Sequence, residues 1–188
     1  MKNICEICGG EYSTIYTGNI RDGAYGGIKN SAVIYECTDC KVQRLREEDC
    51  IPDEFYETGQ YRKRLEESLE SEKAVVEQDE MQHYTLQAFF PESLRGANIL
   101  DVGCGAGSLL DMLKNISLSQ IGVEPCGPYL ELLTKQGYKI YSTLSEAIED
   151  KKGMIDYGFS IQVIEHVKNP IEFLKEIRKL IKPGGRLL

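Results

Sequence analysis

The chain has 188 residues, which is enough for one hydrophobic core and a small accessory unit. Its 22 basic and 30 acidic residues leave a net charge of -8, so the surface repels phosphate backbones and disfavours a nucleic-acid partner. No stretch approaches the ~20 apolar residues of a membrane span, and no basic and apolar leader opens the chain. We therefore expect a cytoplasmic protein without a membrane partner.

The composition changes twice along the chain, which predicts three units. Residues 1–50 are Gly-rich and interrupted, with strand-like runs only at 12–17 and 32–36. Residues 51–92 are charged and helical, and we interpret them as a linker or lid. Residues 93–188 alternate short apolar runs with helical stretches, which predicts an α/β fold with a Rossmann-like parallel sheet flanked by helices.

The third unit has clear element boundaries in its sequence. Pro128 opens a helix that Gly137 closes, and Asn169 and Pro170 begin another that we expect to end at the Pro-Gly-Gly sequence from Pro183. The predicted strands of the sheet lie at residues 98–102, 120–123, 138–141, 155–161 and 185–188.

Four of the seven cysteines stand in two Cys-x-x-Cys pairs in the first unit. Each pair can form a turn whose backbone amides support two thiolates, so that four sulfurs close a tetrahedron around zinc. Metal binding would stabilise a segment with too little apolar material to fold unaided. The predicted ligands are Cys5, Cys8, Cys37 and Cys40.

This metal site is predicted to be structural, because four thiolates leave no open coordination position for catalysis. Two disulfides or a redox pair are the alternatives. A zinc ribbon often indicates nucleic-acid binding, but acidic side chains outnumber basic ones in residues 1–50. The unit therefore offers no basic face to a phosphate backbone.

A glycine-rich loop follows the strand at residues 98–102. The sequence ILDVGCGAG at residues 99–107 lets the backbone turn sharply and approach a ligand at the carboxyl end of the strand. A dinucleotide-binding loop has the pattern Gly-x-Gly-x-x-Gly, whereas here the third glycine comes one position early, at Gly107. That register disfavours a pyrophosphate and hence a nicotinamide-dependent oxidoreductase.

The next strand ends in an acid, Glu124, about twenty residues further on, where a carboxylate suits a ribose diol. The loop and the acid together indicate a nucleoside-bearing cofactor more strongly than either does alone. The alternative is that these are turn glycines and a strand-end acid with no ligand.

These motifs resemble those of the Rossmann-like, class I S-adenosylmethionine-dependent methyltransferases. The resemblance lies in LDVGCGAG at 100–107, GVE at 122–124 and IEHV at 164–167, and it spans about residues 98–188. It implies an enzyme with S-adenosylmethionine as cofactor, held by the glycines at its amino-acid part, by Glu124 at its ribose and by the segment after the third strand at its adenine. The implied cofactor-binding residues are Asp101, Gly103, Cys104, Gly105, Gly107, Glu124, Pro125, Thr143, Leu144, Ile161 and Gln162.

Methyl transfer from a sulfonium needs an aligned nucleophile and, for many acceptors, a base that removes a proton. Glu165 and His166 follow the fourth strand at its carboxyl end, where open sheets bind ligands. His166 is the best candidate for this base, with Glu165 beside it. The alternative is that the pair only packs against or caps the following turn. His83, the other histidine, lies in a helical stretch and is predicted to be a surface or packing residue.

An aromatic and basic stretch at residues 55–62 lies between the first unit and the sheet. Tyr56, Tyr61 and Arg62 in it can fold over the cofactor as a lid, with Tyr61 and Arg62 as cofactor contacts and Arg62 pairing with a carboxylate. A tyrosine-rich segment that opens a helix is equally typical of an interdomain packing surface.

A full sheet of the resembled family has seven strands, whereas about five are predicted here. A truncated chain, a partner chain that completes the sheet, or a short form that binds cofactor without turnover would each explain the difference. An unpaired apolar strand at the edge would favour association, and a homodimer through that edge is one expectation.

The four-cysteine unit together with this fold is similar to the sugar C-methyltransferases that act on nucleotide-linked deoxysugars, in which a Glu-His pair after the fourth strand serves in proton abstraction. Glu165 and His166 match that pair. The resemblance implies a small-molecule methyl acceptor. A zinc-bearing rRNA methyltransferase fits the acidic chain less well, and a non-catalytic zinc-ribbon module that binds cofactor is the non-enzymatic alternative.

Overall fold

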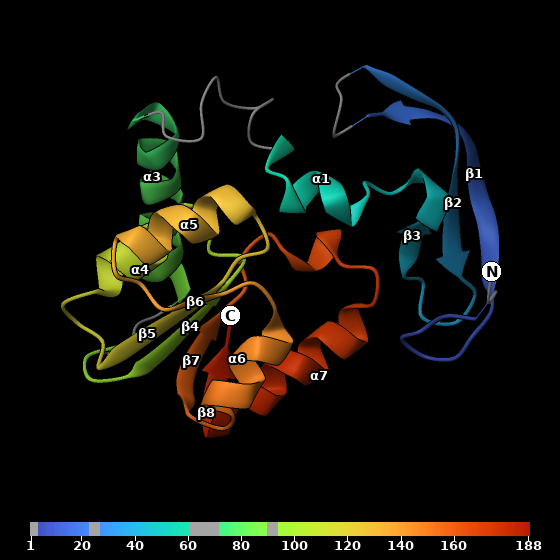
Figure 1. Ribbon diagram of the computed structural model, residues 1–188. Coiled ribbons are helices and arrows are strands. Elements are labelled where there is room, and N and C mark those ends of the chain that lie inside the picture. Colours follow the sequence, from blue (N-terminus) through green and yellow to red (C-terminus); the bar gives the residue numbers. More distant parts are fainter. Residues whose placement is uncertain (1–3, 23–26, 61–71, 90–93) are drawn as a thin grey trace.

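The computed structural model of the chain describes residues 4–22, 27–60, 72–89 and 94–188. Figure 1 shows two sheets, one in each half of the molecule, with helix α1 (Asp53–Glu57) between them. In the described part of the chain no helix is both long and apolar enough to cross a membrane.

The first sheet is antiparallel and has the order β1-β2-β3. Its strands are β1 (Tyr12–Arg21), β2 (Ile28–Cys37) and β3 (Gln43–Leu45), followed by a 3₁₀ turn, η1 (Glu47–Asp49). The two strand-like runs at 12–17 and 32–36 lie inside β1 and β2, as predicted. The three-residue β3 is too short to leave a periodic signal in the sequence.

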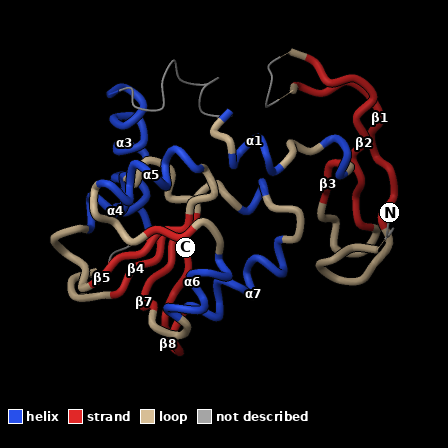
Figure 2. The backbone as a smooth tube through the Cα atoms, in the orientation of Figure 1, coloured by secondary structure: helices blue, strands red, loops and turns tan. Residues whose placement is uncertain are grey.

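The second sheet is parallel, with the order β6-β5-β4-β7-β8, and it confirms the predicted α/β fold. Figure 2 shows its strands together at the centre of their half of the molecule. The strands are β4 (Asn98–Val102), β5 (Ser119–Val123), β6 (Ile140–Tyr141), β7 (Ile155–Phe159) and β8 (Ile181–Leu187).

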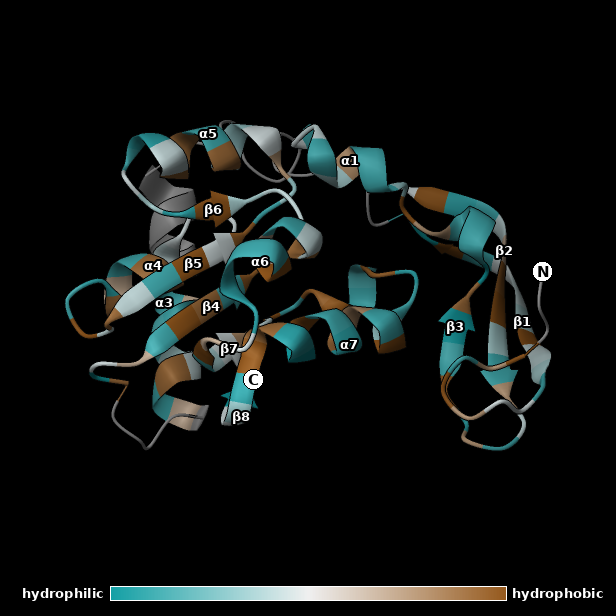
Figure 3. Ribbon diagram, turned by 60° about the horizontal axis from the view of Figure 1, so that its bottom comes forward, coloured by the Kyte–Doolittle hydropathy of each residue, from teal (hydrophilic) through white to brown (hydrophobic). Residues whose placement is uncertain are grey.

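Helices cover both faces of this sheet. Leu100 on one face of β4 packs in a core with Ile177 and Leu180 of α7, and Ile99 on the other face packs with Leu109 and Leu113 of α4. In Figure 3 the brown, apolar residues are concentrated along β4 and β5 between these helical layers. The helices are α3 (Glu72–Phe89), α4 (Ser108–Leu113), α5 (Gly127–Lys135), α6 (Leu144–Lys151) and α7 (Pro170–Leu180).

The junction of α7 and β8 differs from its prediction. The helix ends at Leu180 and not at Pro183, and β8 already begins at Ile181. Ile181 pairs with Ile155, but the next pair is Arg186 with Tyr157, so the Pro-Gly-Gly sequence forms an irregularity inside the strand. This is where a proline, which cannot donate to the ladder, is tolerated in a sheet.

Candidate active site

The glycine loop lies at the carboxyl end of β4, between β5 and the loop that follows β7. Gly103, Gly105 and Gly107 all have left-handed φ angles, of 76°, 53° and 88°. A Cβ on Gly103 would lie 2.5 Å from Cγ2 of Val163, so a side chain there would fill the space between the two loops. Because glycine has no Cβ, a ligand can approach the backbone of this loop closely.

Glu124 joins the end of β5 to this loop. Its carboxylate is 7% exposed; one oxygen accepts a hydrogen bond from Gly105 N and the other from Cys126 N, both at 2.8 Å. A carboxylate oxygen can accept more than one hydrogen bond. The side chain is thus held in one orientation and can still accept hydrogen bonds from a diol.

Asp101 lies beneath the loop and is 5% exposed. Burial, together with the nearby charge of Glu124, raises the pKa of its carboxyl group to about 7. Burial also raises the pKa of the Cys104 thiol, with Asp101 and Glu124 adding to the effect. Cys104 therefore stays a neutral thiol and is not a nucleophile.

A pocket of about 570 Å³ opens at these carboxyl ends. It is lined by most of the residues that the sequence analysis selected: Gly103, Cys104, Gly105, Glu124, Pro125, Ile161, Gln162, Glu165 and His166. Gln162 has a left-handed φ of 56°, which is uncommon for a residue with a side chain and typical of functional loops.

Some selected residues do not line this pocket. Asp101 and Gly107 are buried, and Gly107 is the N-cap of α4. The Thr143 hydroxyl accepts a hydrogen bond from Glu146 N at the start of α6, and Leu144 is buried in the core under that helix. Tyr61 and Arg62 lie outside the described residues.

His166 is exposed at the end of the 3₁₀ turn η2 (Ile164–His166), between β7 and α7. Its Nδ1 is 3.0 Å from the hydroxyl of Tyr56 on α1, and the two ring centroids are 5.3 Å apart. Which atom donates depends on the imidazole tautomer. If Nδ1–H donates to the phenol oxygen, the other ring nitrogen is unprotonated and can accept a proton.

Several side chains of the pocket wall were not selected from the sequence, among them Met81 on α3 and Tyr129 on α5. For Tyr129 a signal was available: it lies in the first turn of the helix that follows Glu124, at the edge of the sheet where ligands bind. Met81 had no such signal, because its approach depends on how α3 packs. His83, also on α3, is exposed.

The four cysteines of the Cys-x-x-Cys pairs lie together, with all sulfur atoms within 4.8 Å of one another and no disulfide among them. The Sγ atoms of Cys5 and Cys40 are 3.7 Å apart, and those of Cys8 and Cys37 are 3.5 Å apart. A tetrahedron with metal–sulfur bonds of about 2.3 Å has edges of about 3.8 Å. The cluster therefore has the size that a zinc ion requires.

The two cysteine pairs also have equivalent backbones. Gly9 N donates to Cys5 O at 2.9 Å, and Lys41 N donates to Cys37 O at 3.1 Å. Gly9 and Lys41 each follow the second cysteine of a pair, and both have a left-handed φ, of 81° and 63°. Two matching turns of this kind aim four sulfurs at one point and are the arrangement predicted for a metal site.

The fold and the pocket are those of a Rossmann-like, class I S-adenosylmethionine-dependent methyltransferase. A family model described as a methyltransferase domain matches residues 76–188, which is more than half of the chain. The chain belongs to this methyltransferase family.

The match to individual proteins is partial. The ubiquinone biosynthesis O-methyltransferase of Roseobacter denitrificans is 33% identical over 101 residues, which cover 50% of this chain and 41% of that protein. The mitochondrial enzyme of the same name from Mus musculus is 32% identical over 105 residues, which cover 50% and 28%. The chain thus spans less than half the length of these curated relatives.

Among solved structures, a similar fold occurs in the complex between the Haloferax volcanii Trm112 methyltransferase activator and a methyltransferase. The TM-score is 0.50 at 18% identity, and the match covers 61% of this chain and 53% of that one. This similarity concerns the fold alone.

Proposed function

We propose that this chain binds S-adenosylmethionine at the carboxyl ends of β4, β5 and β7 and transfers its methyl group to a small-molecule acceptor. One observation carries the proposal: the glycine loop, the held carboxylate of Glu124 and the Glu165-His166 turn line a single pocket. The family to which residues 76–188 belong supports the same activity.

When bound, S-adenosylmethionine supplies an electrophilic methyl group. The chain's own part is to orient both reactants and to accept the proton that the acceptor loses. We assign the acceptance of this proton to His166, with Tyr56 fixing its ring and Glu165 beside it. Glu124 would hold the ribose hydroxyls, and the backbone of the loop at Gly103 and Gly105 would lie along the amino-acid part.

We assign the acceptor to a second cavity next to this pocket. A second cleft, of about 840 Å³, lies between the cysteine unit (residues 1–50) and the segment that joins β7 to α7. The side chains of Tyr12, Tyr35 and Arg44 line it on the side of the cysteine unit. Tyr56 and His166 line both cavities. An acceptor in the cleft would therefore meet the cofactor at His166.

The acceptor class follows from two similarities. The cysteine unit and the Glu-His pair are similar to sugar C-methyltransferases, which supports a nucleotide-linked sugar, whereas the names of the curated relatives support a hydroxyl of a biosynthetic intermediate. Those relatives match about half of this chain, so their names do not establish the acceptor of the whole protein. We favour the sugar, because the acceptor cleft is partly built by the cysteine unit.

We also propose that the chain acts as three units, at residues 1–50, 51–92 and 93–188. Zinc on Cys5, Cys8, Cys37 and Cys40 would have a structural role in the first. The antiparallel sheet of this unit leaves large apolar side chains such as Ile15 and Ile28 exposed, so little of its stability can come from a core.

The test is calorimetric titration with S-adenosylhomocysteine. We expect binding to the wild-type chain and at least a roughly thirty-fold loss of affinity in Glu124→Ala, because two hydrogen bonds to a charged group are lost. The matched control is Glu131→Ala, an exposed acid on α5 that forms an ion pair with Lys135 and does not line the pocket.

Two results would contradict the proposal. One is that S-adenosylhomocysteine does not bind while NAD does. The other is that Glu124→Ala and Glu131→Ala bind it equally well. Methyl-labelled S-adenosylmethionine, offered with a nucleotide-linked deoxysugar or with a phenol, then separates carbon from oxygen acceptors by the position of the label.

A further inference from the structure

Arg44 connects the cysteine unit to the loop that carries His166. It lies on β3, and its guanidinium contacts two parts of the molecule that are far apart in sequence. One nitrogen, Nη1, lies 2.6 Å from Oε1 of Glu6, and the other, Nη2, donates to the carbonyl oxygen of Lys168 at 2.7 Å. The Arg44 and Glu6 side chains are 31% and 22% exposed, so this contact is partly shielded from water.

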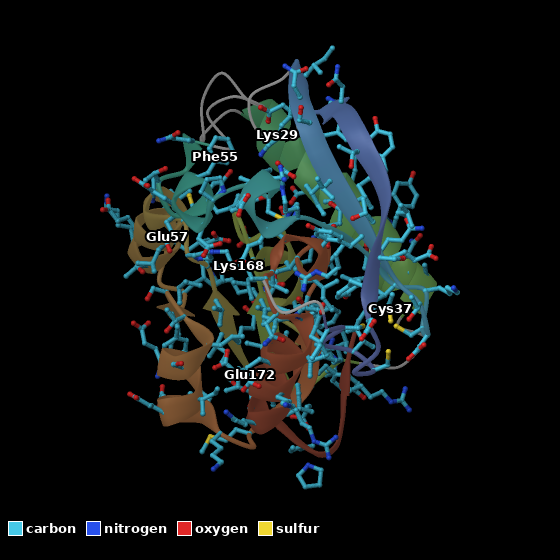
Figure 4. All side chains as sticks on the ribbon, turned by 90° about the vertical axis from the view of Figure 1, so that its right-hand side faces the viewer. Lys29, Cys37, Phe55, Glu57, Lys168 and Glu172 are labelled. Atoms are coloured by element: carbon cyan, nitrogen blue, oxygen red, sulfur yellow. The ribbon has the colours of Figure 1, made fainter. Side chains whose placement is uncertain are left out.

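The two partners of Arg44, Glu6 and Lys168, are each held by a further contact. Glu6 lies between Cys5 and Cys8 in the first turn of the cysteine cluster, and its other oxygen accepts a hydrogen bond from Tyr12 at 3.0 Å. Lys168 pairs through Nζ with Asp53 at the start of α1, at 2.8 Å. Figure 4 views this side of the molecule and labels Lys168 in the middle and Cys37 on the cysteine unit.

The segment held by Arg44 is the one that matters for the proposed chemistry. Lys168 follows His166 by two residues, and both belong to the connection between β7 and α7. His166 N donates to Val163 O at 2.9 Å within the same turn, and Tyr56 of α1 contacts the imidazole. A shift of the Lys168 carbonyl would therefore move the turn and the ring.

We infer that Arg44 is a positioning residue through which the cysteine unit fixes the loop of Glu165 and His166. This inference rests on the proposed function for its catalytic meaning. Its physical basis is the planar guanidinium, whose two nitrogens hold Glu6 and Lys168 O at a set separation. A structural metal in the cysteine cluster would order Glu6 and thereby act on the methyl-transfer site without touching the substrate.

Three variants of the full chain test this. Arg44→Gln removes the charge, Arg44→Lys keeps a charge beside Glu6 but cannot occupy both Nη positions, and Lys29→Gln is the matched control. Lys29 is 32% exposed, donates to the carbonyls of Glu48 and Asp49 within the cysteine unit, and does not line either cavity. Bound zinc per chain reports whether the cysteine cluster survives.

Two readouts need no substrate. Hydrogen–deuterium exchange of peptides from residues 160–170 should become about tenfold faster in both Arg44 variants and stay unchanged in Lys29→Gln. The imidazole signals in NMR spectra are also informative, because the chain has only two histidines. Those of His166 should shift in both Arg44 variants, whereas those of His83 should not.

The inference is overturned if Arg44→Gln behaves like Lys29→Gln, or if Arg44→Lys matches the wild type, since a single charge would then suffice. If Arg44→Gln loses zinc or unfolds the cysteine unit, the decision rests on Arg44→Lys. Because neither readout uses the cofactor, these results stand apart from the S-adenosylhomocysteine titration, which alone tests the proposed function.

Discussion

Asp101 is a buried acid whose burial is costly in the absence of a ligand. Its pKa is raised to about 7 by desolvation and by Glu124, so the folded state binds the proton more tightly than the unfolded state, for which the ordinary value of 3.8 holds. Between about pH 4 and pH 7 the contribution of Asp101 to the free energy of unfolding therefore falls as the pH rises. Above pH 7 the full destabilisation is present. A cationic group such as the ammonium of S-adenosylmethionine would offset it.

Asp101→Asn should remove this pH dependence. We expect the variant to be more stable than the wild type at pH 8, by on the order of 2 kcal/mol, because no charge is left to bury. At pH 4 the two should be about equally stable. Urea unfolding at both pH values measures this, and equal pH dependence in wild type and variant would show that Asp101 is not the responsible group.

Several residues that line the pocket at the carboxyl ends of β4, β5 and β7 could be selected from the sequence, whereas contacts between distant parts of the chain could not. Glu124 could be selected from its distance to the glycine loop along the sequence. Tyr56 and His166 were both candidates, but their 3.0 Å contact joins positions 110 residues apart and depends on how α1 packs. The contact of Arg44 with Lys168 spans 124 residues and left no signal in the sequence.

The glycine loop and helix α4 depend on each other at Gly107. This residue is the N-cap of α4 with a φ of 88°, and a Cβ on it would lie 2.5 Å from Cδ2 of Leu133. Leu133 is fully buried in the core between α4 and α5. Both the backbone angle and the packing therefore require glycine.

Gly107→Ala should cost about 2–4 kcal/mol, from left-handed strain of about 1–2 kcal/mol and overpacking of about 1–2 kcal/mol more. Gly137→Ala is the matched control, because Gly137 has a similar φ of 86° and nothing within 4 Å of its added Cβ. Gly137→Ala should therefore lose only the free energy of unfolding that the left-handed strain costs. Equal losses in thermal or urea unfolding of the two variants would contradict the packing part of this argument.

At the scale of elements, hydrophobic periodicity and the Pro and Gly residues at helix ends predicted the parallel sheet. The same signals gave a wrong boundary where a strand itself contains Pro and Gly. The Pro-Gly-Gly sequence suggests a helix end followed by a new strand, whereas β8 begins before it, at Ile181. Its register is set by tertiary packing: a Cβ on Gly185 would lie 2.9 Å from Asp156 O, so the backbones of β7 and β8 approach closely there. Such an approach cannot be inferred from local sequence.

At the scale of the whole molecule, three segments meet at the connection between β7 and α7. Arg44 comes from the cysteine unit, Tyr56 and Asp53 from α1, and the loop itself from the sheet. The division of the chain into three units, at residues 1–50, 51–92 and 93–188, stays a prediction. Under the proposed function, these contacts would link the cysteine cluster to the loop that carries His166.

The most direct measurement of the central claim is a crystal structure of the chain with S-adenosylhomocysteine. We predict the ribose hydroxyls at Glu124, the amino-acid part over Gly103 and Gly105, and the sulfur directed towards His166. Ligand density in the cleft beside Tyr12 and Arg44 instead, or a ligand whose ribose does not contact Glu124, would contradict this account of the site.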